Sequence, residues 1–254
     1  MSEKWKNGSV LISHFTLYRK RLMPTLNLFG GEKGGVGKSF VARAAAEYHL
    51  EKGLPFALFD TDRSNPDVRR IYGPATGCKV AVFSEGKRYE DTANAIFNAA
   101  LEKRVLVNLA AQSFIPIRQW IEKNELMTLA RENDIQFVHW FVSDCGYDSL
   151  KLLEKTLEYF KTSVTHVLVK NFGMTDDWEP LDEDEKLQGM IADYGVKVIE
   201  FPGFTGNWDR NRIDKASLTF GDALADEDFG LISRQRVKSF LRYAYAAFDE
   251  AGVF

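Results

Sequence analysis

The residues of this chain that most clearly could do chemistry lie in the stretch 30–39, which reads GGEKGGVGKS. Its glycines would let backbone N–H groups turn around a polyphosphate, while Lys38 could reach the β- and γ-phosphates and the Ser39 hydroxyl could bind Mg²⁺. An apolar run at 25–29 precedes the stretch and a helical pattern follows it. This strand–loop–helix order is the one that a phosphate-binding loop requires. The alternative, a glycine-rich turn that binds nothing, is disfavoured by the Lys-Ser pair and the helix that follow.

Two carboxylates come directly after a second apolar run. Asp60 and Asp62 follow the run 56–59, at a spacing that places both at the carboxyl end of a strand. In an open α/β sheet this end borders the ligand crevice. An aspartate that ends a strand can also simply cap a loop, but the glycine-rich stretch favours a functional interpretation.

Apolar runs alternate with helical patterns along the 254 residues. Buried parallel strands read as continuous apolar runs, and the crossovers between them read as helices. We expect strands at 25–29, 56–59, 79–83, 105–109, 136–142, 166–169 and 196–201, and helices around 38–52, 89–102, 117–132, 147–161, 184–194 and 231–250. This order predicts an α/β fold with a doubly wound, mostly parallel sheet flanked by helices.

The segment 33–39, KGGVGKS, resembles the deviant Walker A motif of the ParA/MinD family of ATPases. The resemblance implies a P-loop NTPase fold of the SIMIBI type, with ATP/ADP and Mg²⁺ as ligands. It identifies Lys33 as the signature lysine, which in the family reaches the nucleotide of the partner subunit in an ATP-bound sandwich homodimer. A second cation there would stabilise charge that develops on phosphoryl oxygens; a solvated loop lysine is the alternative. The implied loop contacts to the nucleotide come from Gly34, Gly35, Val36, Gly37, Lys38, Ser39 and Phe40.

The same resemblance assigns catalytic roles to Lys33, Lys38 and Asp62, with Asp62 positioning the attacking water and Asp60 supporting the metal. The strand 105–109 normally carries an aspartate where this chain has Asn108. An amide can orient a water molecule but carries no charge, so the resemblance implies an ATPase whose rate is left open by Asn108. The implied metal-site residues are Ser39, Asp60, Asp62 and Asn108.

The base end of the nucleotide is expected near Asn171, which ends the strand 166–169 and could read adenine through its amide. A turn residue before Gly173 is the alternative. Pro202 and Phe204 follow the strand 196–201, in the loop that covers adenine in the family. The phrase NLAAQS at 108–113 is similar to plasmid mobilisation, stability or conjugal-transfer members.

Arg234, Lys238 and Arg242 recur every four residues and share one face of the last predicted helix. In partition ATPases such residues bind DNA phosphates nonspecifically, but a solvated helix face explains them at least as well. Asp144, which follows the strand 136–142, is expected to cap the next helix.

The whole chain carries a net charge of −3, with 45% hydrophobic and 27% charged residues, and so gives no global argument for nucleic acid or membrane. Its two cysteines exclude a disulfide scaffold. No run approaches the roughly 20 apolar residues of a membrane span. We therefore expect a cytoplasmic protein with a basic N-terminal extension at 1–22 and one nucleotide-binding domain at 23–254.

Three functions are compatible with these features. The first is a slowly hydrolysing ATP-dependent dimerisation switch that acts with a protein partner in plasmid partition, stability or conjugal mobilisation. The second is an ATP-binding switch or adaptor that scarcely hydrolyses, which Asn108 motivates. The third is a small-molecule ligase or kinase of the same fold; Lys33 argues against it, since a lysine that acts across a dimer serves a dimer.

Overall fold

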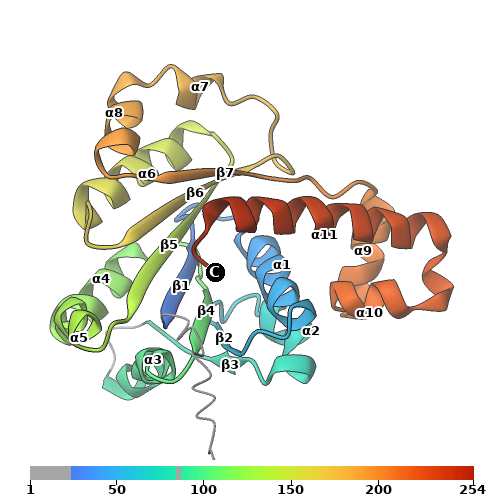
Figure 1. Cartoon of the computed structure of the whole chain (residues 1–254), viewed down its shortest axis with the longest axis horizontal. Helices are drawn as coiled ribbons and strands as arrows, with labels where there is room; N and C mark the ends of the chain where they lie inside the picture. Colours follow the sequence, from blue (N-terminus) through green and yellow to red (C-terminus); the bar gives the residue numbers. More distant parts are fainter. Residues whose placement is uncertain (1–23, 84–86) are drawn as a thin grey trace, which may run out of the picture.

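Seven parallel strands form a single sheet in the computed structural model, which describes residues 24–83 and 87–254 (Figure 1). The sheet order is β3-β2-β4-β1-β5-β6-β7, and every pair of neighbours runs parallel. The strands are β1 (Thr25–Gly30), β2 (Phe56–Asp60), β3 (Lys79–Val80), β4 (Arg104–Asn108), β5 (Gln136–Ser143), β6 (Thr165–Asn171) and β7 (Lys197–Phe201). The predicted doubly wound α/β fold is confirmed.

Helices cover both faces of this sheet (Figure 1). One layer contains α1 (Lys38–Glu51), α2 (Asp67–Thr76), α9 (Asn207–Ala216), α10 (Phe220–Ala225), the 3₁₀ turn η1 (Glu227–Phe229) and the long α11 (Leu231–Ala251). The other contains α3 (Lys87–Ala100), α4 (Phe114–Lys123), α5 (Leu126–Glu132), α6 (Tyr147–Phe160), α7 (Glu179–Asp182) and α8 (Glu185–Asp193). None of the described helices is long and apolar enough to cross a bilayer.

The central strand β1 is buried between the two helical layers. All six residues of β1 are buried. Leu26 and Leu28 pack into the core under α3, α4 and α5, whereas Phe29 packs into the core under α1 and α11. Each face of the strand meets a helical layer, so even its polar side chains are buried, and Asn27 Nδ2 donates to Thr25 Oγ1 at 2.9 Å.

Two predicted elements differ from the structure. The helix expected at 117–132 is two helices, α4 and α5, because the chain turns at Glu125, whose φ of 50° lies in the left-handed region. The strand expected at 79–83 keeps only the two residues of β3. The predicted helix ranges also omit α2, α7, α9 and α10, which are short. The predicted extension at 1–22 lies outside the described residues, and the single domain at 23–254 stays a prediction.

Candidate functional site

The glycine-rich stretch connects β1 to α1, as predicted. Gly30 is the last residue of β1, Gly37 is the N-cap of α1 and Lys38 is its first residue. The crossover after β1 leads to β2 on one side of it, whereas the crossover after β4 leads to β5 on the other side. The loop after β1 therefore lies at the switch point of the sheet, where open α/β sheets bind ligands. The first N–H groups of α1 have no partner within the helix and carry the positive end of its dipole, so this terminus suits an anion.

Lys38 folds back inside the loop that precedes it. Its Nζ donates to the carbonyl of Gly31 at 3.1 Å and to the carbonyl of Lys33 at 2.8 Å. Burial lowers the pKa of the Lys38 ammonium, while the charges of Glu32 and Asp62 act in the opposite direction. A lysine ammonium has three donors, so one N–H remains beyond the two carbonyl bonds. The lysine therefore both shapes the loop and offers a cation to a phosphate.

Asn171 holds the other side of the loop. This buried side chain donates from Nδ2 to the Val36 carbonyl at 2.7 Å, and its Oδ1 accepts from the Gly173 N–H at 3.0 Å. In this arrangement the amide fixes the loop and its own turn. The predicted contact of Asn171 with the nucleotide base has one further hydrogen and one lone pair left for it, and it stays a prediction.

Lys33 and Asp144 form an ion pair across the mouth of the loop. The distance from Lys33 Nζ to Asp144 Oδ2 is 2.7 Å, and the two side chains are 37% and 18% exposed. Asp144 Oδ1 accepts from the N–H of Gly146, the N-cap of α6, so the predicted capping role is only part of what this side chain does. Burial alone would raise the pKa of Asp144, but the Lys33 ammonium and the Gly146 N–H lower it. Within one chain, the predicted signature lysine is thus held by its own β5–α6 turn.

Glu32, the residue before Lys33, joins the loop to the segment after Asn108. Its carbonyl accepts from the Gln112 N–H at 3.0 Å, and its side chain accepts from the backbone N–H groups of Phe114 and Ser113 at the start of α4. Burial raises the pKa of Glu32, and these hydrogen bonds oppose the shift. Glu32 is therefore a structural link between the glycine-rich loop and the start of α4.

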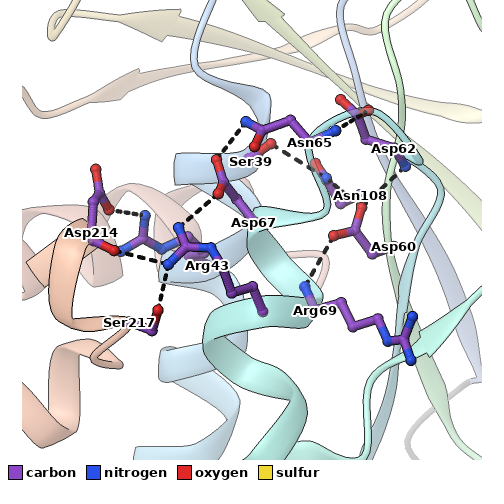
Figure 2. Close-up of polar contacts among 11 residues, drawn as sticks. Ser39, Arg43, Asp60, Asp62, Asn65, Asp67, Arg69, Asn108, Asp214 and Ser217 are labelled. Atoms are coloured by element: carbon purple, nitrogen blue, oxygen red, sulfur yellow. Dashed lines mark hydrogen bonds and ion pairs between the residues drawn. The ribbon is translucent and has the colours of Figure 1, made fainter.

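The predicted metal-site residues gather at the ends of β2 and β4 (Figure 2). Asn108 Nδ2 donates to Asp60 Oδ1 at 2.9 Å and to Ser39 Oγ at 3.3 Å. Asp60 also accepts from the Arg69 N–H at 3.0 Å and the Asp62 N–H at 3.2 Å. Burial raises the pKa of Asp60, and the hydrogen bonds from Arg69 and Asn108 lower it in part. The amide of Asn108 therefore bridges Asp60 to Ser39. A carboxylate in its place could not donate to Asp60 and would repel it unless a cation lay between them.

One observation indicates that these residues suit a magnesium ion. Asn108 Oδ1 is buried and has no hydrogen-bond partner among the described residues, whereas Nδ2 of the same amide is fully used. Mg²⁺ prefers oxygen ligands and keeps several water molecules, so an unpaired amide oxygen beside the Ser39 hydroxyl suits it. Across residues 24–83 and 87–254, no group of three or more His, Cys, Asp or Glu residues could hold a metal ion.

Asp62 shapes its own loop. Its Oδ1 accepts from the N–H groups of Ser64 and Asn65, both at 3.0 Å. The second oxygen forms no hydrogen bond among the described residues and is left for a water molecule or a ligand. The water-handling role of Asp62 stays a prediction.

The residues expected around the base lie near the start of α1. The ring of Phe204 contacts that of Phe40 edge to face, with ring centroids 6.2 Å apart, and that of Phe240 at 5.4 Å. Phe40 and Phe204 are partly buried against the core, and Pro202 is half-buried just after β7. The structure brings Phe40 and Phe204 together, while their contact with a nucleotide stays a prediction.

The three cations predicted on the last helix lie along α11. Lys238 and Arg242 are exposed and Arg234 is half-buried. The Arg242 guanidinium stacks over the Tyr243 ring at 4.8 Å. None of the three forms an ion pair with another described residue. They are placed as predicted, and DNA binding through them stays a prediction.

Sequence reasoning missed two contacts of the site. The pair of Lys33 with Asp144 could have been found, because β5 neighbours β1 in the sheet and both turns leave the same edge. The pair of Arg43 with Asp214, at 2.6 Å, joins α1 to α9 over 171 residues of sequence, and no local pattern signals it.

Comparisons with known proteins give relatives that span most of the chain. Protein MobD of Acidithiobacillus ferrooxidans is 29% identical over 180 residues, which cover 70% of this chain and 77% of MobD. Protein TraL of Escherichia coli is 27% identical over 241 residues, which cover 87% of this chain and 95% of TraL. The solved MinD cell division protein of Aquifex aeolicus aligns with 87% of this chain and 97% of its own, at 12% identity and a TM-score of 0.49. No family model matches the chain.

Proposed function

We propose a function on the premise that this chain is a ParA/MinD-type P-loop protein of the mobilisation group, to which its similarity to MobD and TraL assigns it. In this proposal the chain binds ATP and Mg²⁺ at residues 33–40 and closes into a sandwich homodimer. Slow hydrolysis then resets the monomer. The relatives' names and the phrase at 108–113 support a role in conjugal mobilisation or transfer of plasmid DNA, together with a protein partner.

The observation that carries the proposal is that the two lysines of the loop have different contacts and point in different directions. Lys38 Nζ lies inside the loop, on the carbonyls of Gly31 and Lys33. Lys33 Nζ points out of the loop and is held by Asp144, with 37% of its side chain exposed. In this proposal Lys38 is assigned to a phosphate bound by its own subunit. The other lysine is at the surface, where a second subunit could receive it once Asp144 lets it go.

The remaining residues take the following parts. The N–H groups at the start of α1 bind phosphate oxygens. Ser39 and Asn108 would hold Mg²⁺, which when bound neutralises charge on the phosphates. Asp62 orients the attacking water with its free oxygen, and Asp60, which accepts from the Arg69 N–H and the Asn108 amide, supports the metal.

A direct binding measurement tests this site. Titration of the chain with ATP and Mg²⁺ in a calorimeter is expected to show one site per chain, and Lys38→Ala is expected to abolish binding. Lys103→Ala is the matched control, since Lys103 is exposed and precedes β4 at the opposite end of the sheet. Unchanged binding by Lys38→Ala would refute the assignment of the loop.

Lys33→Ala separates binding from dimerisation. This variant is expected to bind ATP about as tightly as the wild type and to remain monomeric with ATP and Mg²⁺ in light scattering, whereas the wild type dimerises. A variant that still dimerises would contradict the role of Lys33 across the interface.

A second candidate function is an ATP-binding switch with little hydrolysis, and Asn108 favours it. This amide brings no charge to the metal site and is already engaged with Asp60 and Ser39. ATP turnover measured with and without DNA or a protein partner distinguishes the two candidates. Phosphate release that rises with DNA or with the partner excludes a switch that scarcely hydrolyses ATP.

A further inference from the structure

A chain of polar contacts leads away from the Asp62 loop, residues 61–66 (Figure 2). Asp62 accepts from the N–H groups of Ser64 and Asn65, and Asn65 Nδ2 donates to Asp67 Oδ2 at 2.7 Å. Asp67 is the first residue of α2. The loop that carries the predicted water-handling carboxylate is therefore tied to the start of α2 by side chains, in addition to the covalent chain.

Arg70 is the junction of this polar chain. Its Nη2 donates to Asp67 Oδ1 at 2.7 Å, while its Nη1 donates to the carbonyl of Asp214 at 2.8 Å and to the hydroxyl of Ser217. Ser217 is the C-cap of α9, with a left-handed φ of 54°. The planar guanidinium fork thus joins α2 to the end of α9, across 144 residues of sequence.

The same end of α9 is fixed to the phosphate-binding helix. Arg43, which is one helical turn after Ser39 on α1, donates from Nη1 to Asp214 Oδ1 at 2.6 Å. Its side chain is 4% exposed and its guanidinium lies over the rings of Phe40 and Phe220. Asp214 therefore receives Arg43 on its carboxylate and Arg70 on its carbonyl. Helix α9 is thus tied to α1 through Arg43 and, through Arg70 and the start of α2, to the Asp62 loop.

The two arginines differ in what their contacts can do. The Arg70 side chain is 41% exposed and its partner Asp67 is 27% exposed, and ion pairs as exposed as this contribute little to global stability. Arg70 nevertheless makes three contacts in one rigid geometry. Its effect should therefore be local: it restrains where the Asp62 loop and the end of α9 stand relative to each other.

We propose that Arg70 is a positioning residue that couples the Asp62 loop to helix α9. The inference rests on the proposed function, because Arg70 would transmit the conformational change that a bound nucleotide causes in the Asp62 loop. When ATP orders the Asp62 loop, Arg70 carries this order to Asp214 and Ser217. The start of the same helix carries Trp208, which is 68% exposed.

Hydrogen exchange of the nucleotide-free protein gives the first test. In Arg70→Ala, peptides that cover 61–67 and 213–218 are expected to exchange about three- to tenfold faster than in the wild type, while peptides of β1, β4 and β5 keep their rates. Arg69→Ala is the matched control: it removes an arginine from the same helix turn whose guanidinium forms no hydrogen bond or ion pair among the described residues (Figure 2). Arg70→Lys keeps the charge but lacks the fork, so at least one of the two segments should still loosen.

The second test adds ATP and Mg²⁺. In the wild type, we expect both segments to become more protected; in Arg70→Ala, only 61–67 should respond. Equal protection of 213–218 in the wild type and in Arg70→Ala would overturn the coupling, and so would faster exchange throughout the sheet in the first test, which would mean general destabilisation.

The inference and the proposed function can fail separately. If the wild type binds no ATP in calorimetry, the proposed function fails. If it binds ATP and the two segments of Arg70→Ala behave as in the wild type, the proposed function stands and the role of Arg70 is refuted.

Discussion

Replacing Gly37 by alanine tests how the phosphate-binding loop is held. Gly37 has a φ of 95°, and a Cβ built on it would lie 2.4 Å from Asn171 Nδ2. Gly35 is the matched control in the same loop, because its φ of 83° is also left-handed but its Cβ would meet nothing within 4 Å. Both substitutions strain the backbone, and only Gly37→Ala pushes the Asn171 amide off the carbonyl of Val36.

The expected sizes follow from these two contributions. A left-handed backbone costs an alanine about 1–2 kcal/mol, so Gly35→Ala should lower the free energy of unfolding by that amount. Gly37→Ala adds the loss of a buried hydrogen bond of 2.7 Å and leaves the Val36 carbonyl without a partner, which costs about 1–3 kcal/mol more. The total for Gly37→Ala is therefore about 2–5 kcal/mol.

Urea unfolding followed by tryptophan fluorescence, to which the buried Trp120, Trp140 and Trp178 contribute, measures both variants. A double-mutant cycle completes the experiment: once Gly37→Ala has broken the bond, Asn171→Ala should cost much less than it does in the wild type. Equal losses for Gly35→Ala and Gly37→Ala, or full additivity with Asn171→Ala, would refute the view that Asn171 holds the loop.

Three further predictions follow from the electrostatics of the site. Asn108→Asp places a second carboxylate 2.9 Å from Asp60 and removes the hydrogen-bond donor to Asp60. In thermal melts this variant should therefore be less stable than the wild type without Mg²⁺, and it should regain stability when Mg²⁺ and ATP are added. A loss of stability that Mg²⁺ and ATP do not reverse would contradict the proposed metal site. Asp144→Asn removes the ion pair with Lys33 at a cost of about 0–1 kcal/mol. Because Lys33 no longer has to leave Asp144, this variant should lower the ATP concentration at which light scattering detects dimers. A higher ATP concentration would contradict the proposal that Lys33 leaves Asp144 when the dimer forms. Burial and the charge of the neighbouring histidine lower the pKa of His139 from 6.5 to about 3; the unfolded chain therefore binds a proton that the folded chain does not, so stability falls as the pH drops below about 6.5, and His139→Leu should flatten this loss in urea titrations between pH 6.5 and 4.

The sequence was sufficient for the features that local patterns encode. Continuous apolar runs located the strands, since β1, β4 and β5 are buried on both faces. The edge strands β3 and β7 are partly exposed. The glycine-rich stretch located the loop because strand, loop and helix are contiguous in the chain. The carboxyl-end rule then placed Asp60 and Asn108 at the same edge, where they are 2.9 Å apart.

Contacts over long sequence separations could not be predicted in this way. The apolar pattern gives no register between α2 and α9, so the bonds of Arg70 to Asp214 and Ser217 had no local signal. Helix α9 is mostly polar, and α4 and α5 are divided by a single left-handed residue, Glu125. The commitment of Asn171 to the Val36 carbonyl likewise depends on how closely β6 approaches the loop.

The most direct test of the account is a structure of the chain with Mg²⁺ and a slowly hydrolysed ATP analogue. The account predicts a dimer in which the 2.7 Å pair of Lys33 and Asp144 is broken, with Lys38 on the phosphates of its own subunit and Lys33 on those bound to the other. A nucleotide-loaded chain in which Lys33 stays on Asp144, or points away from the second subunit's nucleotide, would contradict it.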